Sequence, residues 1–278
     1  MTARTVLGLA TVGLLVAGVV GWVGGMPQPA SSASAGPASL PLAHAGSTRA
    51  GAGAHAGVDP APGQPGTGEG GTGQGGAGES GGAGAARSAM DGVVDAGWLA
   101  STAAATGVPA RALEAYAGAA VRQKQAGPGC GVAWNTLAAI GTVESGNGTH
   151  GGAHLGADGR LVGHIYGPEL NGKGYAAVPD SDGGALDGDT AWDRAVGPMQ
   201  FLPSTWARDG VDGSGDGTAD PDNIDDAALS AATYLCEIGG DLTTAAGWQA
   251  AIAGYNDNPD YAEQVRAQAD LFAHEVDG

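Results

Sequence analysis

Residues 133–145 read AWNTLAAIGTVES and are followed directly by Gly146-Asn147-Gly148. Apolar side chains recur through this stretch at the three- and four-residue spacing of an α-helix, at Trp134, Leu137, Ala138, Ile140 and Val143. Gly and Asn are residues that commonly end a helix at its C-terminus. The sequence therefore predicts a mostly buried helix over residues 133–145.

Glu144 is the one acidic residue in this apolar stretch and stands at its C-terminal edge. Apolar surroundings disfavour the ionised carboxylate, which raises its pKa toward the value that a general acid needs near neutral pH. The alternative is an exposed glutamate, but the C-terminal end of a helix disfavours negative charge. We therefore expect Glu144 to be a catalytic acid.

Two further segments carry side chains that suit a polar substrate. In residues 195–206, Gly197 permits close approach of the backbone to a ligand, and Gln200 offers a donor and an acceptor to a sugar. In residues 253–261, Tyr255 and Asn256 close an apolar helix, and Tyr261 follows. Each segment has an ordinary alternative when taken alone: a loop-to-helix turn for the first, and core tyrosines for the second.

The rest of residues 91–278 has mainly helical signals. Apolar spacing and Pro positions predict helices over residues 108–125, from 203 onward, and over 225–238, 243–255 and 260–276. Residues 147–192 are rich in Gly and Asp, which predicts a long irregular excursion with a short hairpin. The pattern predicts one mainly α domain, without βαβ alternation and without an internal repeat.

The first 90 residues have a different composition. Residues 1–25 contain a long uncharged apolar run behind Arg4, as in a membrane anchor or an export signal peptide. Residues 26–90 consist mainly of Gly, Ala, Pro and Ser, and we expect a disordered tether because so few apolar side chains cannot offset the entropy lost on folding. Either reading of residues 1–25 places the domain outside the cytoplasm, anchored to the cytoplasmic membrane or secreted.

The charge of the chain lies almost wholly in the predicted domain. Residues 91–278 contain 8 Lys and Arg against 26 Asp and Glu, a net charge of −18. A polyphosphate would be repelled, so nucleic acid is excluded as a partner. The surplus acid serves either a solvated surface or bound cations.

Two cysteines, Cys130 and Cys236, both fall within the predicted domain. An exported domain with two cysteines favours a disulfide bond between them. The alternative is a pair of buried free thiols.

In their order, the three segments resemble the motifs of lytic transglycosylases: Glu144-Ser145, Gly197-Pro198-Met199-Gln200 and Gly254-Tyr255-Asn256. The stretch over residues 108–276 looks like the membrane-bound lytic murein transglycosylase B branch in its actinobacterial form. The resemblance implies a lysozyme-like α+β fold, the SLT domain, acting on the glycan strands of peptidoglycan. Asp257 departs from the branch, which often has His there, and Ala191 replaces a Ser that some members carry.

The resemblance also implies a mechanism with a single carboxylate and no required cofactor. Glu144 protonates the bond between MurNAc and GlcNAc and then takes a proton from the C6 hydroxyl, which closes a 1,6-anhydro ring. Substrate contacts are implied for Ser145, Gly197, Met199, Gln200, Tyr255, Asn256 and Tyr261. A hydrolytic muramidase would need a second carboxylate, for which Asp189 and Asp193 are the candidates, and a non-catalytic cell-wall-binding module would need no Glu144.

Residues 212–218, DGSGDGT, match the first half of a calcium-binding EF-hand loop, with oxygens at Asp212, Ser214, Asp216 and Thr218. The resemblance supplies Asp226 as the closing carboxylate, so a structural calcium ion is the expectation and a metal-free turn the alternative. A second acidic stretch, at Asp180, Asp182, Asp187, Asp189 and Asp193, lacks such spacing and predicts a solvated loop.

Overall fold

The computed structural model describes residues 88–173 and 176–277. Its helices are α1 (Ala96–Thr106), α2 (Ala110–Ala126), α3 (Trp134–Ser145), α4 (Pro203–Asp209), α5 (Ile224–Gly239), α6 (Ala245–Tyr255), α7 (Pro259–Asp277) and the short 3₁₀ turn η1 (His150–Gly152). The strands β1 (His154–Leu155) and β2 (Leu161–Val162) form a two-stranded antiparallel hairpin. The fold is mainly α, as the sequence predicts.

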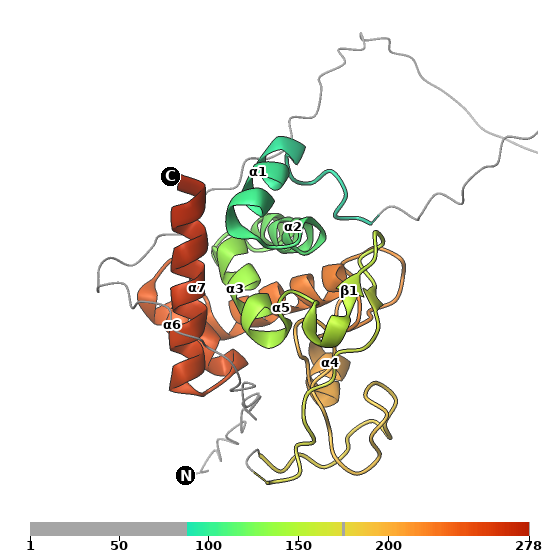
Figure 1. Ribbon diagram of the computed structural model, residues 1–278. Coiled ribbons are helices and arrows are strands. Elements are labelled where there is room, and N and C mark those ends of the chain that lie inside the picture. The colour runs from blue at the N-terminus through green and yellow to red at the C-terminus, as the bar shows by residue number, and fades with distance from the viewer. Residues whose placement is uncertain (1–87, 174–175, 278) are drawn as a thin grey trace, which may run out of the picture.

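Helix α3 lies at the centre of the helical bundle (Figure 1). It packs against α2 and α7, while α5 packs against α2 and α6. Its first eight residues are buried, which matches the apolar spacing of the sequence. Gly141 lets α2 approach closely, because a side chain there would overlap the Tyr116 hydroxyl.

The disulfide bond between Cys130 and Cys236 is present, as predicted. It joins the segment that leads into α3 to the last turn of α5. In the same place, the Leu242 amide donates to the Cys130 carbonyl at 2.7 Å. The start of α3 is thereby fixed against the segment between α5 and α6.

Helix α1 is not among the helices that apolar spacing predicts. Thr102 is its one buried residue, so most of the helix faces solvent and no strong apolar stripe appears in the sequence. Its ends carry ordinary caps: Asp95 accepts from the Trp98 amide at 2.8 Å, and Gly107 adopts a left-handed φ of 69°. Trp98, Leu99 and Ala103 are partly buried and pack against the core, with the Trp98 ring 5.4 Å from the Trp134 ring. The caps and this packing together hold the helix.

The folded domain begins earlier than the predicted boundary between residues 90 and 91. Met90 is fully buried, and the Ala89 amide donates to the Ser214 carbonyl at 2.7 Å. The Ser88 hydroxyl donates to Asp225 at 2.6 Å. The predicted tether therefore includes three residues too many, Ser88, Ala89 and Met90. Composition alone does not reveal the contacts that these residues make with the domain.

The proposed anchor at residues 1–25, and the tether up to residue 87, lie outside the described residues. Within the described part, every helix falls short of the combination of length and hydropathy that a membrane-spanning segment needs.

Candidate active site

The C-terminal end of α3 places Glu144 one residue before the helix stops. Gly146 adopts a left-handed φ of 61°, and its amide donates to the Thr142 carbonyl at 3.0 Å. The Asn147 amide donates to the Gly141 carbonyl at 2.8 Å, which completes a Schellman-type cap. The helix end is therefore rigid, and the position of the Glu144 backbone is fixed.

The carboxyl group of Glu144 is enclosed, although the residue as a whole is only partly buried. Its Oε1 atom is inaccessible to solvent and has no hydrogen-bond partner among the described residues. Burial raises the pKa of Glu144 to about 8, and the Tyr261 hydroxyl beside it opposes the rise. Glu144 is therefore largely protonated at neutral pH, as an acid catalyst requires.

The loop at residues 197–200 lies directly against the end of α3. The Ser145 hydroxyl donates to the Pro198 carbonyl at 2.6 Å and accepts from the Gly148 amide at 2.8 Å. Gln200 has a left-handed φ of 51°, which is uncommon for a residue with a side chain. Its Nε2 donates to the carbonyls of Gly197 and Ile165, at 2.8 and 3.2 Å.

The structure explains the glycine at position 197 by backbone packing, and not by the close approach of a ligand that the sequence predicts. Its φ is 78°, and a Cβ atom there would lie 2.1 Å from the Pro221 carbonyl oxygen. The absence of a side chain therefore allows two backbone segments to meet. The expectation that this glycine admits a ligand is not needed to explain its presence.

The end of α6 and the start of α7 supply the third side of the site. The Tyr255 hydroxyl donates to the Met199 carbonyl at 2.7 Å, which ties α6 to the loop. Tyr255 and Tyr261 are both buried, and the nearby Glu144 contributes to raising the pKa of each, after burial itself. Asn256 is buried at the C-cap of α6, where its Oδ1 accepts from the Asn258 amide.

The structure thus brings together the three segments that the sequence singles out. All seven residues expected to contact substrate are buried in this structure: Ser145, Gly197, Met199, Gln200, Tyr255, Asn256 and Tyr261. The hydrogen bonds of Ser145, Gln200 and Tyr255 hold the framework around Glu144. Contact with substrate stays a prediction for all seven.

Sequence reasoning misses the backbone carbonyls that complete this framework and the pair formed by Tyr116 and Asn147. The Tyr116 hydroxyl donates to the Asn147 side chain at 3.0 Å, next to the turn of α3 that carries Glu144. The sequence gives Tyr116 only as an apolar position of a helix. Its partner is 31 residues away, so no local spacing could reveal the pair.

The two candidates for a second catalytic carboxylate are engaged elsewhere. Asp193 is fully buried and accepts from the amide and the hydroxyl of Ser181, at 2.9 and 2.7 Å. Asp189 accepts from the Ala191 and Trp192 amides and pairs with Arg194. Across the described residues, no second carboxylate contributes to the pKa of Glu144.

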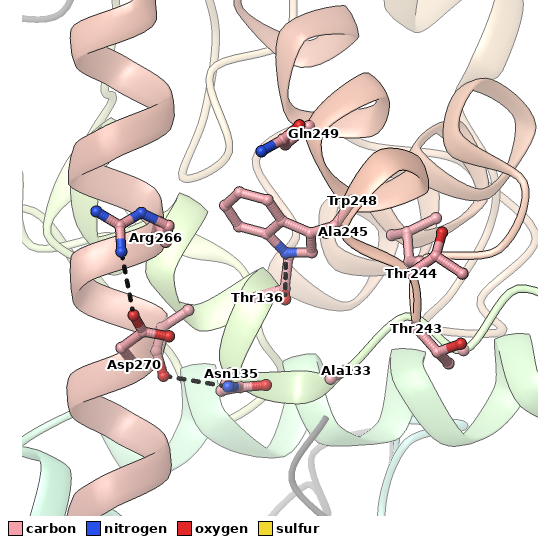
Figure 2. A pocket seen from close by; sticks show the side chains of 13 residues that line it. Ala133, Asn135, Thr136, Thr243, Thr244, Ala245, Trp248, Gln249, Arg266 and Asp270 are labelled. Carbon is pink, nitrogen blue, oxygen red and sulfur yellow. Dashed lines mark hydrogen bonds and ion pairs between the residues drawn. The ribbon is translucent and has the colours of Figure 1, made fainter. Parts of the chain in front are cut away.

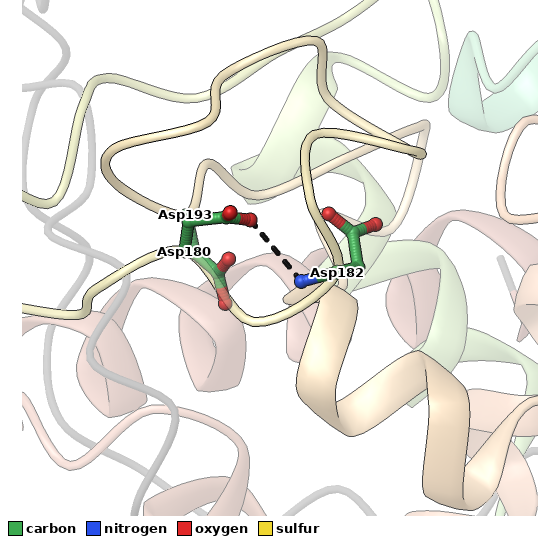
Figure 3. A group of neighbouring side chains, drawn as sticks. All are labelled: Asp180, Asp182 and Asp193. Atoms are coloured by element: carbon green, nitrogen blue, oxygen red, sulfur yellow. Dashed lines mark hydrogen bonds between the residues drawn. The ribbon is translucent and has the colours of Figure 1, made fainter.

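The stretch from Asp180 to Asp193 is a folded loop, so the expectation of a solvated loop is wrong for its buried members, Asp187 and Asp193. Oxygens of Asp180, Asp182 and Asp193 lie within 4.8 Å of one another, as a metal-binding group would (Figure 3). Backbone amides already donate to all three carboxylates, and these bonds account for the loop without an ion.

The loop of the expected calcium site is held by its own amides. Asp212 accepts from the Gly215 and Gly217 amides, and Asp226 accepts from three loop amides. Asp216 forms an ion pair with Arg160 at 2.6 Å. Among the described residues, the carboxylates of Asp212, Asp216 and Asp226 do not form a group as close as that of Asp180, Asp182 and Asp193. Calcium binding by this loop stays a prediction.

Residues 181–276 match the family model of the transglycosylase SLT domain. The match includes the 197–200 loop and the end of α6, and it begins after Glu144. No curated protein and no solved structure matches the chain. The SLT domain indicates an enzyme, a peptidoglycan lytic transglycosylase of the lyase class.

Gly197→Ala should destabilise the protein by about 3 kcal/mol or more, because it adds a clash with Pro221 to the strain of a left-handed φ. Gly92→Ala is the matched control: its φ is 73°, and nothing lies within 4 Å of the added Cβ. That variant should lose only about 1 kcal/mol. Urea unfolding measures both, and equal losses would contradict the packing role of Gly197.

The raised pKa of Glu144 predicts a pH-dependent stability. Between its ordinary value of 4.5 and about 8, the folded protein holds a proton that the unfolded chain has released. The contribution of Glu144 is therefore fully present below pH 4.5 and is lost as the pH rises to about 8, by at most about 1.4 kcal/mol per pH unit.

Glu144→Gln removes the titrating group. The free energy of unfolding of the Glu144→Gln variant should therefore fall less steeply than that of the wild type between pH 5 and about 8. Urea unfolding at several pH values measures both slopes. Identical slopes would show that the pKa of Glu144 is not raised.

Proposed function

We propose that Glu144 serves first as general acid and then as general base in non-hydrolytic cleavage of the MurNAc-β-1,4-GlcNAc bond. Its proton passes to the glycosidic oxygen, the bond to C1 of MurNAc breaks, and an oxocarbenium-like state forms. The resulting carboxylate takes the proton of the C6 hydroxyl while O6 bonds to C1. The product ends in 1,6-anhydro-MurNAc, and no water is consumed.

The observation that carries this proposal is the enclosed carboxyl group of Glu144, whose Oε1 has no hydrogen-bond partner in the described part of the chain and whose pKa is raised by burial to about 8. Leaving a buried polar atom without a hydrogen bond costs about 1–3 kcal/mol. Such a cost is expected where a group must be free to act on a substrate. An enclosed acid with a pKa near 8 can also recover its proton from a C6 hydroxyl after it has given one away.

Tyr261 and Tyr255 have separate tasks in this proposal. The Tyr261 hydroxyl lies beside the carboxyl group of Glu144 and interacts with it, so it is suited to orient the carboxyl group or the sugar. Tyr255 positions the 197–200 loop through the Met199 carbonyl. Gln200 and Asn256 would complete the substrate contacts if the site opens on binding.

The surroundings of Glu144 favour a transglycosylase over a hydrolytic muramidase. A hydrolase uses a second carboxylate as a nucleophile or to activate water. Asp189 and Asp193 are bound within their own loop.

Peptidoglycan as substrate implies action outside the cytoplasm. A place in the transglycosylase B branch, in its actinobacterial form, and a membrane anchor at residues 1–25 belong to the same proposal.

Glu144→Gln should reduce lytic activity on purified peptidoglycan by about 10²–10⁴-fold, because it preserves shape and removes the proton. Glu263→Gln, at an exposed position of α7, is the matched control and should be active. In the wild type, kcat/KM should decline as the pH rises above about 8, where Glu144 loses its proton.

Mass analysis of the released muropeptides identifies the reaction. Anhydro-MurNAc ends are the expected result, whereas reducing ends would identify a hydrolase. Release of no fragments by the wild type would leave only a cell-wall-binding role.

We further propose that calcium binds the 212–226 loop as a structural ion, after Asp216 has left Arg160. The ion would then be held by oxygens of Asp212, Ser214, Asp216, Thr218 and Asp226. It would brace the loop beside the 197–200 segment and take no part in the chemistry.

Millimolar calcium should raise the melting temperature relative to the protein in chelator, since a ligand that binds only the folded state stabilises it. Asp212→Asn should abolish this shift. Magnesium is the matched control ion, and it should have a smaller effect because it favours a smaller, octahedral site. A melting temperature that is unchanged by calcium would remove the calcium site from the proposal.

A further inference from the structure

A cavity of about 290 Å³ lies where the N-terminus of α3 meets α6 and α7. It is at the opposite end of α3 from Glu144, and the separation of nine positions between Asn135 and Glu144 corresponds to about 14 Å along the helix. Figure 2 shows the polar side chains around it, which come from all three helices: Asn135, Thr136, Trp248, Gln249, Arg266 and Asp270.

Two features of this cavity attract a negative group. Ala133 is the N-cap of α3, and no side chain in the described chain caps the helix, so the positive end of the helix dipole is uncompensated there. Arg266 stands at the rim with its side chain 59% exposed. Asp270 also lines the cavity and pairs with Arg266 at 3.6 Å, through one of the five N–H donors of the guanidinium group.

One buried acceptor faces the same cavity. Asn135 is 4% exposed, and its Nδ2 donates to the Ala269 carbonyl at 3.1 Å. That bond fixes the orientation of the amide, and Oδ1 has no hydrogen-bond partner among residues 88–173 and 176–277. In Figure 2 the nitrogen points toward α7 and the oxygen points the other way, along the cavity lining toward Ala133. A ligand here needs a donor as well as an anionic group.

The indole ring of Trp248 gives the cavity an apolar wall. Its Nε1 donates to the Thr136 hydroxyl at 3.1 Å, which fixes the ring between α6 and α7. A small apolar side chain can pack against such a ring. Anionic, donor and apolar contacts within one small cavity are the combination that a short peptide with a free carboxylate offers.

We propose that this cavity binds a peptide that ends in a carboxylate, and that the peptide is the stem carried by the glycan strand. The carboxylate pairs with Arg266 at the N-terminus of α3, and a peptide N–H donates to Asn135 Oδ1. The identity of the peptide rests on the proposed function. One helix would then carry the acid that cuts the glycan at one end and a peptide subsite at the other.

Binding is tested with the full chain and two synthetic probes: the tetrapeptide L-Ala-γ-D-Glu-L-Lys-D-Ala and the same peptide with a C-terminal amide. Titration calorimetry should give at least about fivefold tighter binding of the free acid, as for a charge-assisted pair. Arg266→Gln should abolish that preference. Arg208→Gln, a similarly exposed arginine on α4 that pairs with Asp209, should keep it. Equal binding of both probes, or no loss in Arg266→Gln, would overturn the proposal.

Cleavage assays on two substrates distinguish a role of this peptide subsite from a role of the active site. On peptide-bearing strands, Arg266→Gln should lower kcat/KM about fivefold, and on strands stripped of peptides it should have no effect. An equal loss on both substrates would mean that the cavity holds sugar, which contradicts the proposal. Failure of Glu144 as the acid would leave tetrapeptide binding intact, so the two proposals fail by different observations.

Discussion

The hydroxyl of Ser145 donates to the Pro198 carbonyl at 2.6 Å, and through this bond the end of α3 is joined to a loop 53 residues later in the chain. The loop is joined in turn to α6 by Tyr255 and to the segment after β2 by Gln200. All of these acceptors are backbone carbonyls, so the bonds fix the course of the chain as well as the side chains that donate. The cap at Gly146 and the left-handed conformations of Gly197 and Gln200 lie at this junction.

The enclosure of Glu144 is a consequence of the same junction. A carboxyl group at a helix C-terminus already meets the negative end of the dipole, and enclosure by two tyrosines removes the water that would solvate its charge. Both effects favour the proton. The domain as a whole carries a net charge of −18, yet no second acid approaches Glu144 closely enough to alter its pKa among the described residues. Its acidity is set locally, by burial.

The elements of the fold could be predicted from the sequence where burial is periodic. Apolar spacing predicts helix α3, and the expected oxidising compartment predicts the disulfide bond. The order of the three motifs predicts that they converge. Helix α1 was not predicted because Thr102 is its one buried residue and its contacts with the core come from side chains that are only partly buried, which leaves a weak apolar pattern. The fold of the 180–193 loop was hidden because its carboxylates bind amides of the same loop, which composition cannot distinguish from solvation. The reason for Gly197 lies in the Pro221 carbonyl, a backbone group that carries no sequence signal.

The contacts that enclose Glu144 also have a meaning for the folding of the chain. Ser145 to Pro198 and Met199 to Tyr255 are separated by 53 and 56 residues, and the disulfide closes a separation of 106 residues. Closing loops of this length costs more chain entropy than forming a local helix, so these contacts are expected to form after the helices. Until they form, Glu144 is an ordinary solvated carboxylate that is ionised near neutral pH. An incompletely folded chain therefore lacks the acid, and the capacity to donate a proton appears only when the tertiary structure is complete.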